Sequence, residues 1–175
     1  WGVAYRVEEL TDRRATVNVD IAVEKHEATG DRLEATAELY DTAGRRVASK
    51  RIRIADGSRG VTQQSLTLRV ADPRRWDVES PNLYTLKTVL LRNGRAVDEC
   101  TIRAGFRTLE FDANKGFALN GRWMKVKGVC LHHDAGVLGA VVPEEVWRRR
   151  LVNLKQIGVN AIRMSHNPQA PVVYD

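Results

Sequence analysis

Cysteine is scarce in this 175-residue chain: only Cys100 and Cys130 are present, and they have no CxxC spacing. Two thiols of this kind do not make a disulfide framework, so the fold must depend on a packed core. We expect both to be free, with Cys100 in the core at the end of a strand. The sequence leaves a single bridge between them open.

Long apolar runs are also missing, because no stretch approaches the roughly 18 residues of a membrane span. The net charge is +6, yet basic and acidic residues are mixed along the chain and no nucleic-acid-binding motif occurs. We therefore expect no membrane partner and no nucleic-acid partner, and a solvated basic surface instead. The length allows one domain and part of a second, and the start at Trp1 suggests processing or excision.

Residues 1–107 carry the pattern of a β-sandwich. Alternating apolar and polar residues predict strands at 17–23, 33–39, 51–54, 65–70, 84–90 and 96–102. Asn93 and Gly94 predict a two-residue hairpin turn in which both residues need positive φ. Such spacing is typical of an immunoglobulin-like sandwich, although the Cys…Trp…Cys pattern of antibody domains is absent.

Residues 108–175 change to a β–α–β pattern. A hairpin is predicted around Asn120–Gly121, with a return arm that continues through 129. A helix is predicted over 143–157, with Pro143 at its first position and Gly158 as its stop. Its apolar stripe comprises Trp147, Leu151, Leu154 and Ile157. A strand over 160–164 follows, and the connection predicts a parallel pair.

Polar loops end both strands of this pair and hold three of the four histidines. The first loop contains His132, His133 and Asp134, and the second contains Arg163 and His166. Because carboxyl ends of parallel strands share a rim, these residues are candidates for binding polar substrate groups. Structural histidines are the alternative. A zinc site is conceivable, but adjacent histidines in a loop match no recognised ligand spacing.

Two tryptophans, Trp76 and Trp123, allow two interpretations. They are candidate sugar-stacking platforms, but large aromatic residues of a β domain more often fill its core. We expect the core.

Five segments resemble glycoside hydrolase family 2, in that family's order. They are Trp76 with 81–84 (PNLY), 105–111 (GFRTLEF), 116–121 (GFALNG), 128–136 (GVCLHHDAG) with Leu138–Gly139, and 160–168 (NAIRMSHNP). The 128–136 loop is most similar to the β-galactosidase branch. The resemblance implies a sandwich followed by the first β–α–β portion of a truncated (β/α)8 barrel.

The resemblance also implies a retaining exo-β-glycosidase with two catalytic glutamates, one directly after an asparagine on a later strand. No Asn-Glu pair occurs in this sequence, so we expect no catalytic residue in the chain and no activity from it alone. His132, His166 and Arg163 match pocket residues, and His133 and Asp134 match less securely. The family's magnesium ligands lie further along, so no metal or cofactor is expected here.

Cys130 and Leu131 depart from the commoner Asn-Arg or Asn-Lys, which weakens the choice of sugar. A β-galactoside is the expected substrate, with β-glucuronides and β-mannosides as alternatives. The rival class is a non-catalytic sandwich that binds carbohydrate or acts as a spacer. An incomplete barrel should self-associate or remain mobile beyond about residue 127. The family and the lack of disulfides imply a bacterial parent, cytoplasmic or periplasmic.

Overall fold

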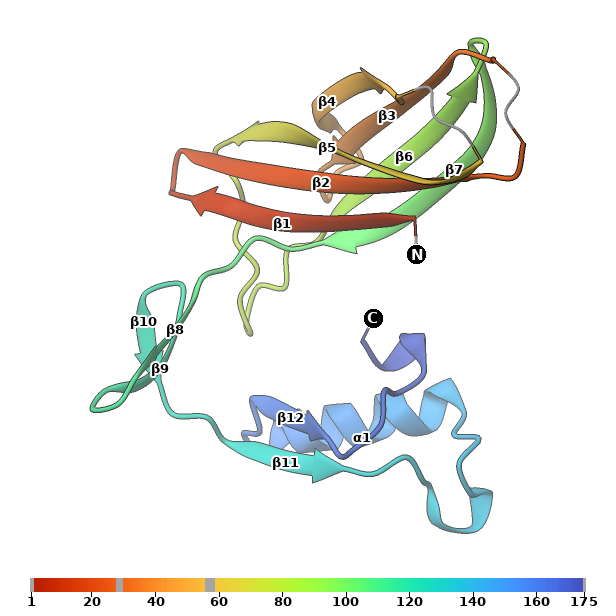
Figure 1. Cartoon of the computed structure of the whole chain (residues 1–175). Helices are drawn as coiled ribbons and strands as arrows, with labels where there is room; N and C mark the ends of the chain where they lie inside the picture. Colours follow the sequence, from red (N-terminus) through yellow and green to blue (C-terminus); the bar gives the residue numbers. More distant parts are fainter. Residues whose placement is uncertain (1, 28–29, 56–58, 175) are drawn as a thin grey trace. The chain divides into compact units, whose positions relative to one another are not determined.

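The computed structural model describes residues 2–27, 30–55 and 59–174. The chain divides into two compact units (Figure 1). The first comprises Trp1–Leu109 with Leu119–Gly121, and the second comprises Glu110–Ala118 with Arg122–Asp175.

The first unit is a sandwich of two antiparallel sheets, as predicted. One sheet has the order β1 (Val3–Leu10), β2 (Arg14–Lys25) and β5 (Gly60–Ala71). The other has the order β4 (Arg46–Arg53), β3 (Leu33–Tyr40), β6 (Tyr84–Arg92) and β7 (Arg95–Ala104). Seven strands divided in this way make an immunoglobulin-like sandwich.

The edges of the sandwich were the parts that the sequence pattern predicted least well. β1 was missed, because its alternation breaks at a register shift between Val7 and Glu9 against β2. β4 begins at Arg46 and not at residue 51, because this edge strand is largely exposed and polar. The Asn93–Gly94 turn is confirmed, with φ of 51° and 82°.

The core of the sandwich lies between the sheets. β2 contributes every second residue to it: Ala15, Val17, Val19, Ile21 and Val23. Phe106 is 0% exposed, and its ring lies 4.6 Å from the ring of Tyr84. The Tyr84 hydroxyl accepts a hydrogen bond from the Arg74 N–H at 2.9 Å, so the polar end of this buried ring has a partner.

The second unit begins with a three-stranded sheet of order β10-β9-β8. These strands are β8 (Leu109–Asp112), β9 (Gly116–Leu119) and β10 (Arg122–Met124). The Asn120–Gly121 turn has the expected positive φ of 54° and 77°. The predicted continuation of the return arm through 129 is wrong: β10 ends at Met124, and β11 (Gly128–Leu131) pairs instead with β12 (Ala161–Met164).

The β11–β12 pair is parallel, as predicted, and α1 (Glu144–Gln156) connects the two strands. Pro143 is the N-cap and not the first helical residue, because its ψ of 150° is extended. Trp147 is buried, at 2% exposure, whereas Ile157 is the C-cap and is 78% exposed. The expectation that Ile157 belongs to the apolar stripe is therefore wrong. Gly158 ends the helix with φ of 87°.

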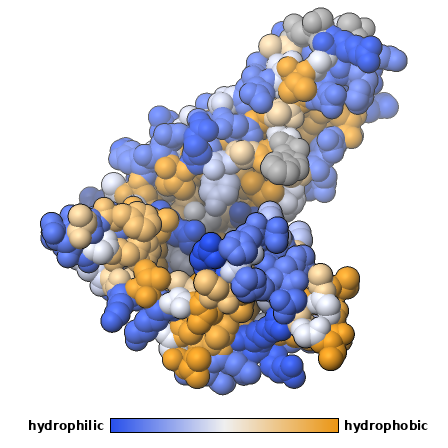
Figure 2. Space-filling model, turned by 60° about the horizontal axis from the view of Figure 1, so that its bottom comes forward, coloured by the Kyte–Doolittle hydropathy of each residue, from blue (hydrophilic) through white to orange (hydrophobic). Residues whose placement is uncertain are grey.

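Two short 3-10 turns complete the second unit: η1 (Gly136–Leu138) and η2 (Pro171–Val173). Several large apolar side chains of this unit remain exposed, among them Val137, Val141 and Val152. Apolar surface of this kind appears as orange patches among blue polar surface in Figure 2.

Candidate functional site

The parallel pair β11–β12 builds the candidate site. Cys130 is the register partner of Arg163, and both are exposed, whereas their neighbours Val129 and Ile162 are half-buried. Alternation along a strand therefore places Cys130 and Arg163 on the open face of the pair. Both strands end at the same edge, where the two predicted loops begin.

The structure brings His132 and His166 together at this edge. Their ring centroids lie 5.8 Å apart in an edge-to-face arrangement, and both residues are exposed. The strand pairing extends into the loops, because the Ser165 N–H donates to the Leu131 carbonyl at 3.0 Å. Two imidazoles so placed can donate hydrogen bonds to neighbouring hydroxyls of one polar ligand.

Arg163 lies in the same unit, and its Nη1 donates to the Ser165 Oγ at 3.4 Å. His133 and Asp134 are exposed, and within the described residues their side chains form no hydrogen bond or ion pair. The structure thus joins His132 with His166, and leaves His133 and Asp134 outside that pair.

Arg150 is a residue of the site region that the sequence pattern did not indicate. Its Nη1 donates to the Asp134 carbonyl at 2.6 Å, and its guanidinium lies 5.3 Å from the Trp147 ring centroid. The spacing of three residues places Arg150 on the same helix face as Trp147, but it does not indicate the bond to the Asp134 carbonyl. Arg150 ties the His132 loop to α1.

No carboxylate of the described residues takes part in the histidine pair. Glu144 and Glu145 are exposed in the first turn of α1, and Glu144 faces Arg148 at 3.6 Å. Glu110 is exposed in β8. Among residues 2–27, 30–55 and 59–174, no three His, Cys, Asp or Glu side chains are grouped so that they could hold a metal ion.

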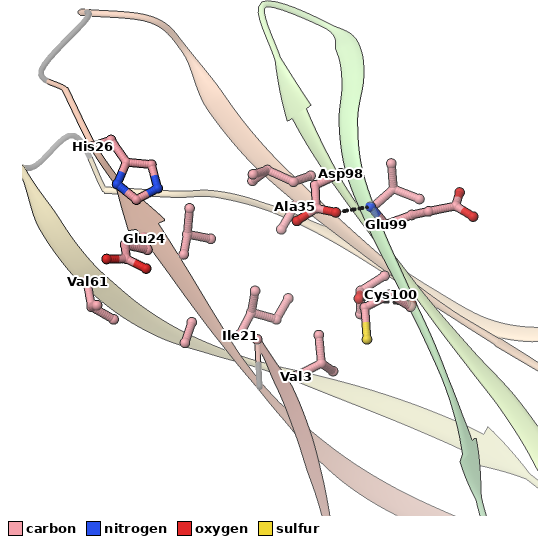
Figure 3. A pocket seen from close by; sticks show the side chains of 15 residues that line it. Val3, Ile21, Glu24, His26, Ala35, Val61, Asp98, Glu99 and Cys100 are labelled. Atoms are coloured by element: carbon pink, nitrogen blue, oxygen red, sulfur yellow. Dashed lines mark hydrogen bonds between the residues drawn. The ribbon is translucent and has the colours of Figure 1, made fainter. Parts of the chain in front are cut away.

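A pocket of about 530 Å³ lies in the sandwich, and none of the candidate substrate-binding residues lines it. Val3 and Ile21 contribute apolar walls, and Asp98, beside Cys100 on β7, accepts a hydrogen bond from the Glu99 N–H (Figure 3). Among the described residues that line it, none is Trp, Tyr or Phe. This part of the lining therefore offers none of the large aromatic rings on which sugars commonly stack.

The two tryptophans of interest are not core residues. Trp123 is 41% exposed, with the Lys115 ammonium 5.5 Å from its ring centroid, so the expected burial is wrong. Trp76 is half-buried beneath the Arg107 guanidinium, at 4.7 Å. Neither lines the sandwich pocket.

Two protein-family models match this chain in sequence order. Residues 3–107 match the model for glycosyl hydrolases family 2, and residues 112–175 match the TIM barrel domain of the same family. The chain belongs to glycosyl hydrolase family 2. The β–α–β portion described above is accordingly the start of that family's TIM barrel.

Relatives in this family include both galactosidases and glucuronidases. The β-galactosidase BoGH2A of Bacteroides ovatus is 39% identical over 177 residues, which cover 100% of this chain and 21% of that protein. A β-glucuronidase of Bacteroides fragilis is 32% identical over 178 residues, covering 99% of this chain and 25% of that protein. The chain thus spans about a fifth to a quarter of these relatives.

Solved structures agree with the fold. A family 2 member from Bacteroides cellulosilyticus superimposes with a TM-score of 0.93 at 32% sequence identity, covering 99% of this chain and 22% of that one. Within the part of the chain that the structure describes, no helix has the length and apolar character needed to cross a membrane.

Proposed function

We propose that this chain is part of a retaining exo-β-glycosidase that hydrolyses terminal β-galactosides. The observation that carries the proposal is the His132–His166 pair, 5.8 Å between ring centroids, at the carboxyl edge of the first two barrel strands. Enzymes on this fold hold their substrates at that edge. The 39% identity to a β-galactosidase over the whole chain supports the choice of sugar.

In this proposal the chain supplies binding contacts. His132 and His166 hydrogen-bond the hydroxyls of the terminal sugar and strengthen those bonds as charge develops in the transition state. Arg163, on the open face of β12, orients a catalytic carboxylate by a charge-assisted hydrogen bond. His133 and Asp134, which are exposed beside His132, serve as outer contacts for the sugar or its aglycone.

The bond-breaking groups lie elsewhere in the parent enzyme. Retention needs two carboxylates about 5–5.5 Å apart, one as nucleophile and one as acid/base. This sequence has no Asn-Glu pair, and Glu144 and Glu145, which follow the His132 loop, lie in the first turn of α1. The chain alone should therefore be inactive. We also propose that the sandwich covers residues 1–107 and the barrel portion 108–175, a division that the matched ranges 3–107 and 112–175 support.

The first test is to sequence the gene beyond the codon for Asp175. The proposal expects several hundred further codons that encode an Asn-Glu pair at the end of a barrel strand. The longer protein should then release nitrophenol from an aryl β-galactoside faster than from the β-glucuronide or β-mannoside, while the 175-residue chain releases none. Turnover by the 175-residue chain would contradict the assignment of catalysis to other segments.

Single substitutions in the longer protein test the site. His166→Ala should lower kcat/KM by about 10²-fold, because it removes a hydrogen-bond donor to the transition state. The matched control is His26→Ala, which removes the one histidine outside the two loops, an exposed side chain at the sandwich pocket. Equal effects of the two substitutions would contradict the proposed site.

A carbohydrate-binding sandwich is the second candidate, and the pocket is the observation that favours it. Its described lining is mostly apolar and acidic, with His26 at one side and no Trp, Tyr or Phe, so we expect no affinity for galactose or its oligomers. Calorimetric titration of the 175-residue chain with galacto-oligosaccharides tests this expectation. Saturable binding that is unchanged in the His166→Ala variant would indicate that the sandwich binds carbohydrate.

A further inference from the structure

His166 has an unusual backbone conformation. Its φ of 69° lies in the left-handed region, which few residues other than glycine adopt. Its side chain is nevertheless the one that meets His132. A conformation of this kind persists only where surrounding contacts over-determine it, and it gathers at functional sites.

Contacts on both sides of His166 hold the loop. On the N-terminal side, Ser165 is buried and its N–H donates to the Leu131 carbonyl at 3.0 Å. On the C-terminal side, the Gln169 N–H donates to the Tyr174 hydroxyl at 3.1 Å. Tyr174 is itself placed by the η2 turn, where its N–H donates to the Pro171 carbonyl at 3.0 Å.

The hydrogen bond that holds Gln169 is accepted by Tyr174. Gln169 is only 6% exposed, yet neither atom of its side-chain amide has a hydrogen-bond partner among the described residues. The bond from its backbone N–H to Tyr174 is therefore the hydrogen bond that fixes this residue.

We propose that Tyr174 is a positioning residue for the sugar-binding pair. By accepting the Gln169 N–H, its hydroxyl closes the 165–174 loop and keeps His166 left-handed, with the imidazole beside His132. Its importance for turnover rests on the proposed function, whereas its effect on loop structure does not.

The test is Tyr174→Phe in the 175-residue chain, followed by nuclear magnetic resonance. We expect exchange of the Gln169 amide to speed up by about tenfold or more, because its hydrogen bond is lost. The nuclear Overhauser contact between the His132 and His166 rings should weaken or disappear. The matched control is Tyr5→Phe, since the Tyr5 hydroxyl accepts the Gly105 N–H at 3.0 Å in the sandwich. Unchanged Gln169 exchange and an unchanged ring contact in Tyr174→Phe would overturn the proposal.

A second variant separates positioning from general loss of structure. Glycine adopts positive φ without strain, so Tyr174→Phe should shift the backbone resonances of Ser165 and Asn167 less in the His166→Gly background than in the unaltered chain. Exchange of the Gln169 amide should be fast in both backgrounds, because the acceptor hydroxyl is absent from both. If Tyr174 only supports the fold, the two sets of resonance shifts should be equal, and the proposal fails.

Activity gives an independent readout. In the longer protein, Tyr174→Phe should raise KM for an aryl β-galactoside and lower kcat/KM by about tenfold, as a small misplacement of a binding group does. If the unaltered longer protein has no glycosidase activity, the proposed function fails, and the exchange result still decides the role of Tyr174.

Discussion

In the sandwich, sixteen hydrophobic residues are buried in one cluster, whereas in the described part of the second unit the buried hydrophobic residues are Ala118, Trp147 and Val173. Exposed large hydrophobic residues show the reverse. Among the described residues, the first unit has Val61, Val97 and Leu109, and the second has Phe111, Trp123, Val126, Val137, Leu138, Val141, Val152, Ile157 and Tyr174. Both units form regular strands, but only the sandwich closes a core around them.

The difference shows that a segment can form regular strands and helices without closing a hydrophobic core. Two sheets of a sandwich cover each other's apolar faces. A parallel pair with one helix cannot, because parallel sheets need cover on both faces. The open face of β11–β12, with Cys130 and Arg163, is also the face that a barrel would enclose.

The largest expected effect is in the sandwich core. Phe106→Ala should lower the free energy of unfolding by about 3–5 kcal/mol, because it leaves a cavity beside Tyr84. Urea titration followed by tryptophan fluorescence measures it. Ile157→Ala, at an exposed helix end, should change stability by less than about 0.5 kcal/mol. Similar losses from both would erase the contrast between the units.

Trp147→Ala should act on the second unit alone. Trp147 is the largest buried side chain there, so its loss should abolish amide protection throughout α1. The unfolding midpoint of the sandwich should stay unchanged, because its core contains no residue of α1. A shift of that midpoint would show that the two units unfold together.

Asn120 gives a smaller effect at the hairpin turn. Its side chain donates to the Trp76 carbonyl at 2.9 Å and accepts the Thr108 N–H at 3.1 Å. Asn120→Gly keeps the positive φ but removes these two bonds and a longer third one, from the Asn120 amide to Asp77 Oδ2 at 3.4 Å. It should cost about 1–3 kcal/mol of sandwich stability. Asn114→Ala is the control, because Asn114 is exposed and its side chain forms no hydrogen bond among the described residues. Thermal unfolding of both variants makes the comparison, and an equal or smaller loss from Asn120→Gly would contradict a special role for Asn120.

The smallest effect concerns acid stability. Burial raises the pKa of Glu34, but hydrogen bonds from Arg51 and Arg32 outweigh it and hold the pKa below the ordinary 4.5. Hydrogen bonds from Tyr40 and Arg46 likewise lower the pKa of Glu38. A carboxylate with a depressed folded pKa stabilises the fold above the unfolded pKa.

Sandwich stability should therefore be fully present above about pH 4.5 and fall as the pH drops below it. Glu34→Gln should flatten that decline, whereas Glu79→Gln, at an exposed position, should leave it unchanged. Thermal unfolding between pH 3 and 6 measures both, and parallel pH curves for the two variants would contradict the role of Glu34.

The sequence predicted best where alternation, turn chemistry and capping agree. Strands β2, β3 and β6, both Asn-Gly turns and α1 follow from such local signals. β1 and β4 were missed or shortened because edge strands need not alternate cleanly. The break between β10 and β11 depends on pairing with β12, a contact that becomes visible only in three dimensions.

The proximity of His132 and His166 was predicted from the sequence, but the contacts that support their loops were not. His132 and His166 stood out because histidines in loops after parallel strands converge. The roles of Arg150 and Tyr174 could not be read in the same way. Arg150 bonds to the Asp134 carbonyl in the preceding loop, and Tyr174 accepts the Gln169 N–H within its own loop. Bonds from a side chain to a backbone group leave no pattern in the sequence.

Residue-resolved amide hydrogen exchange of the intact chain tests most directly whether the sandwich is complete and the barrel portion is not. The account predicts the slowest exchange in β2, β3 and β6, at the global stability of the sandwich, with exchange in α1 and β12 faster by several orders of magnitude. A monomer in which α1 exchanges as slowly as β2 would contradict it, because the second unit would then be as well closed as the first.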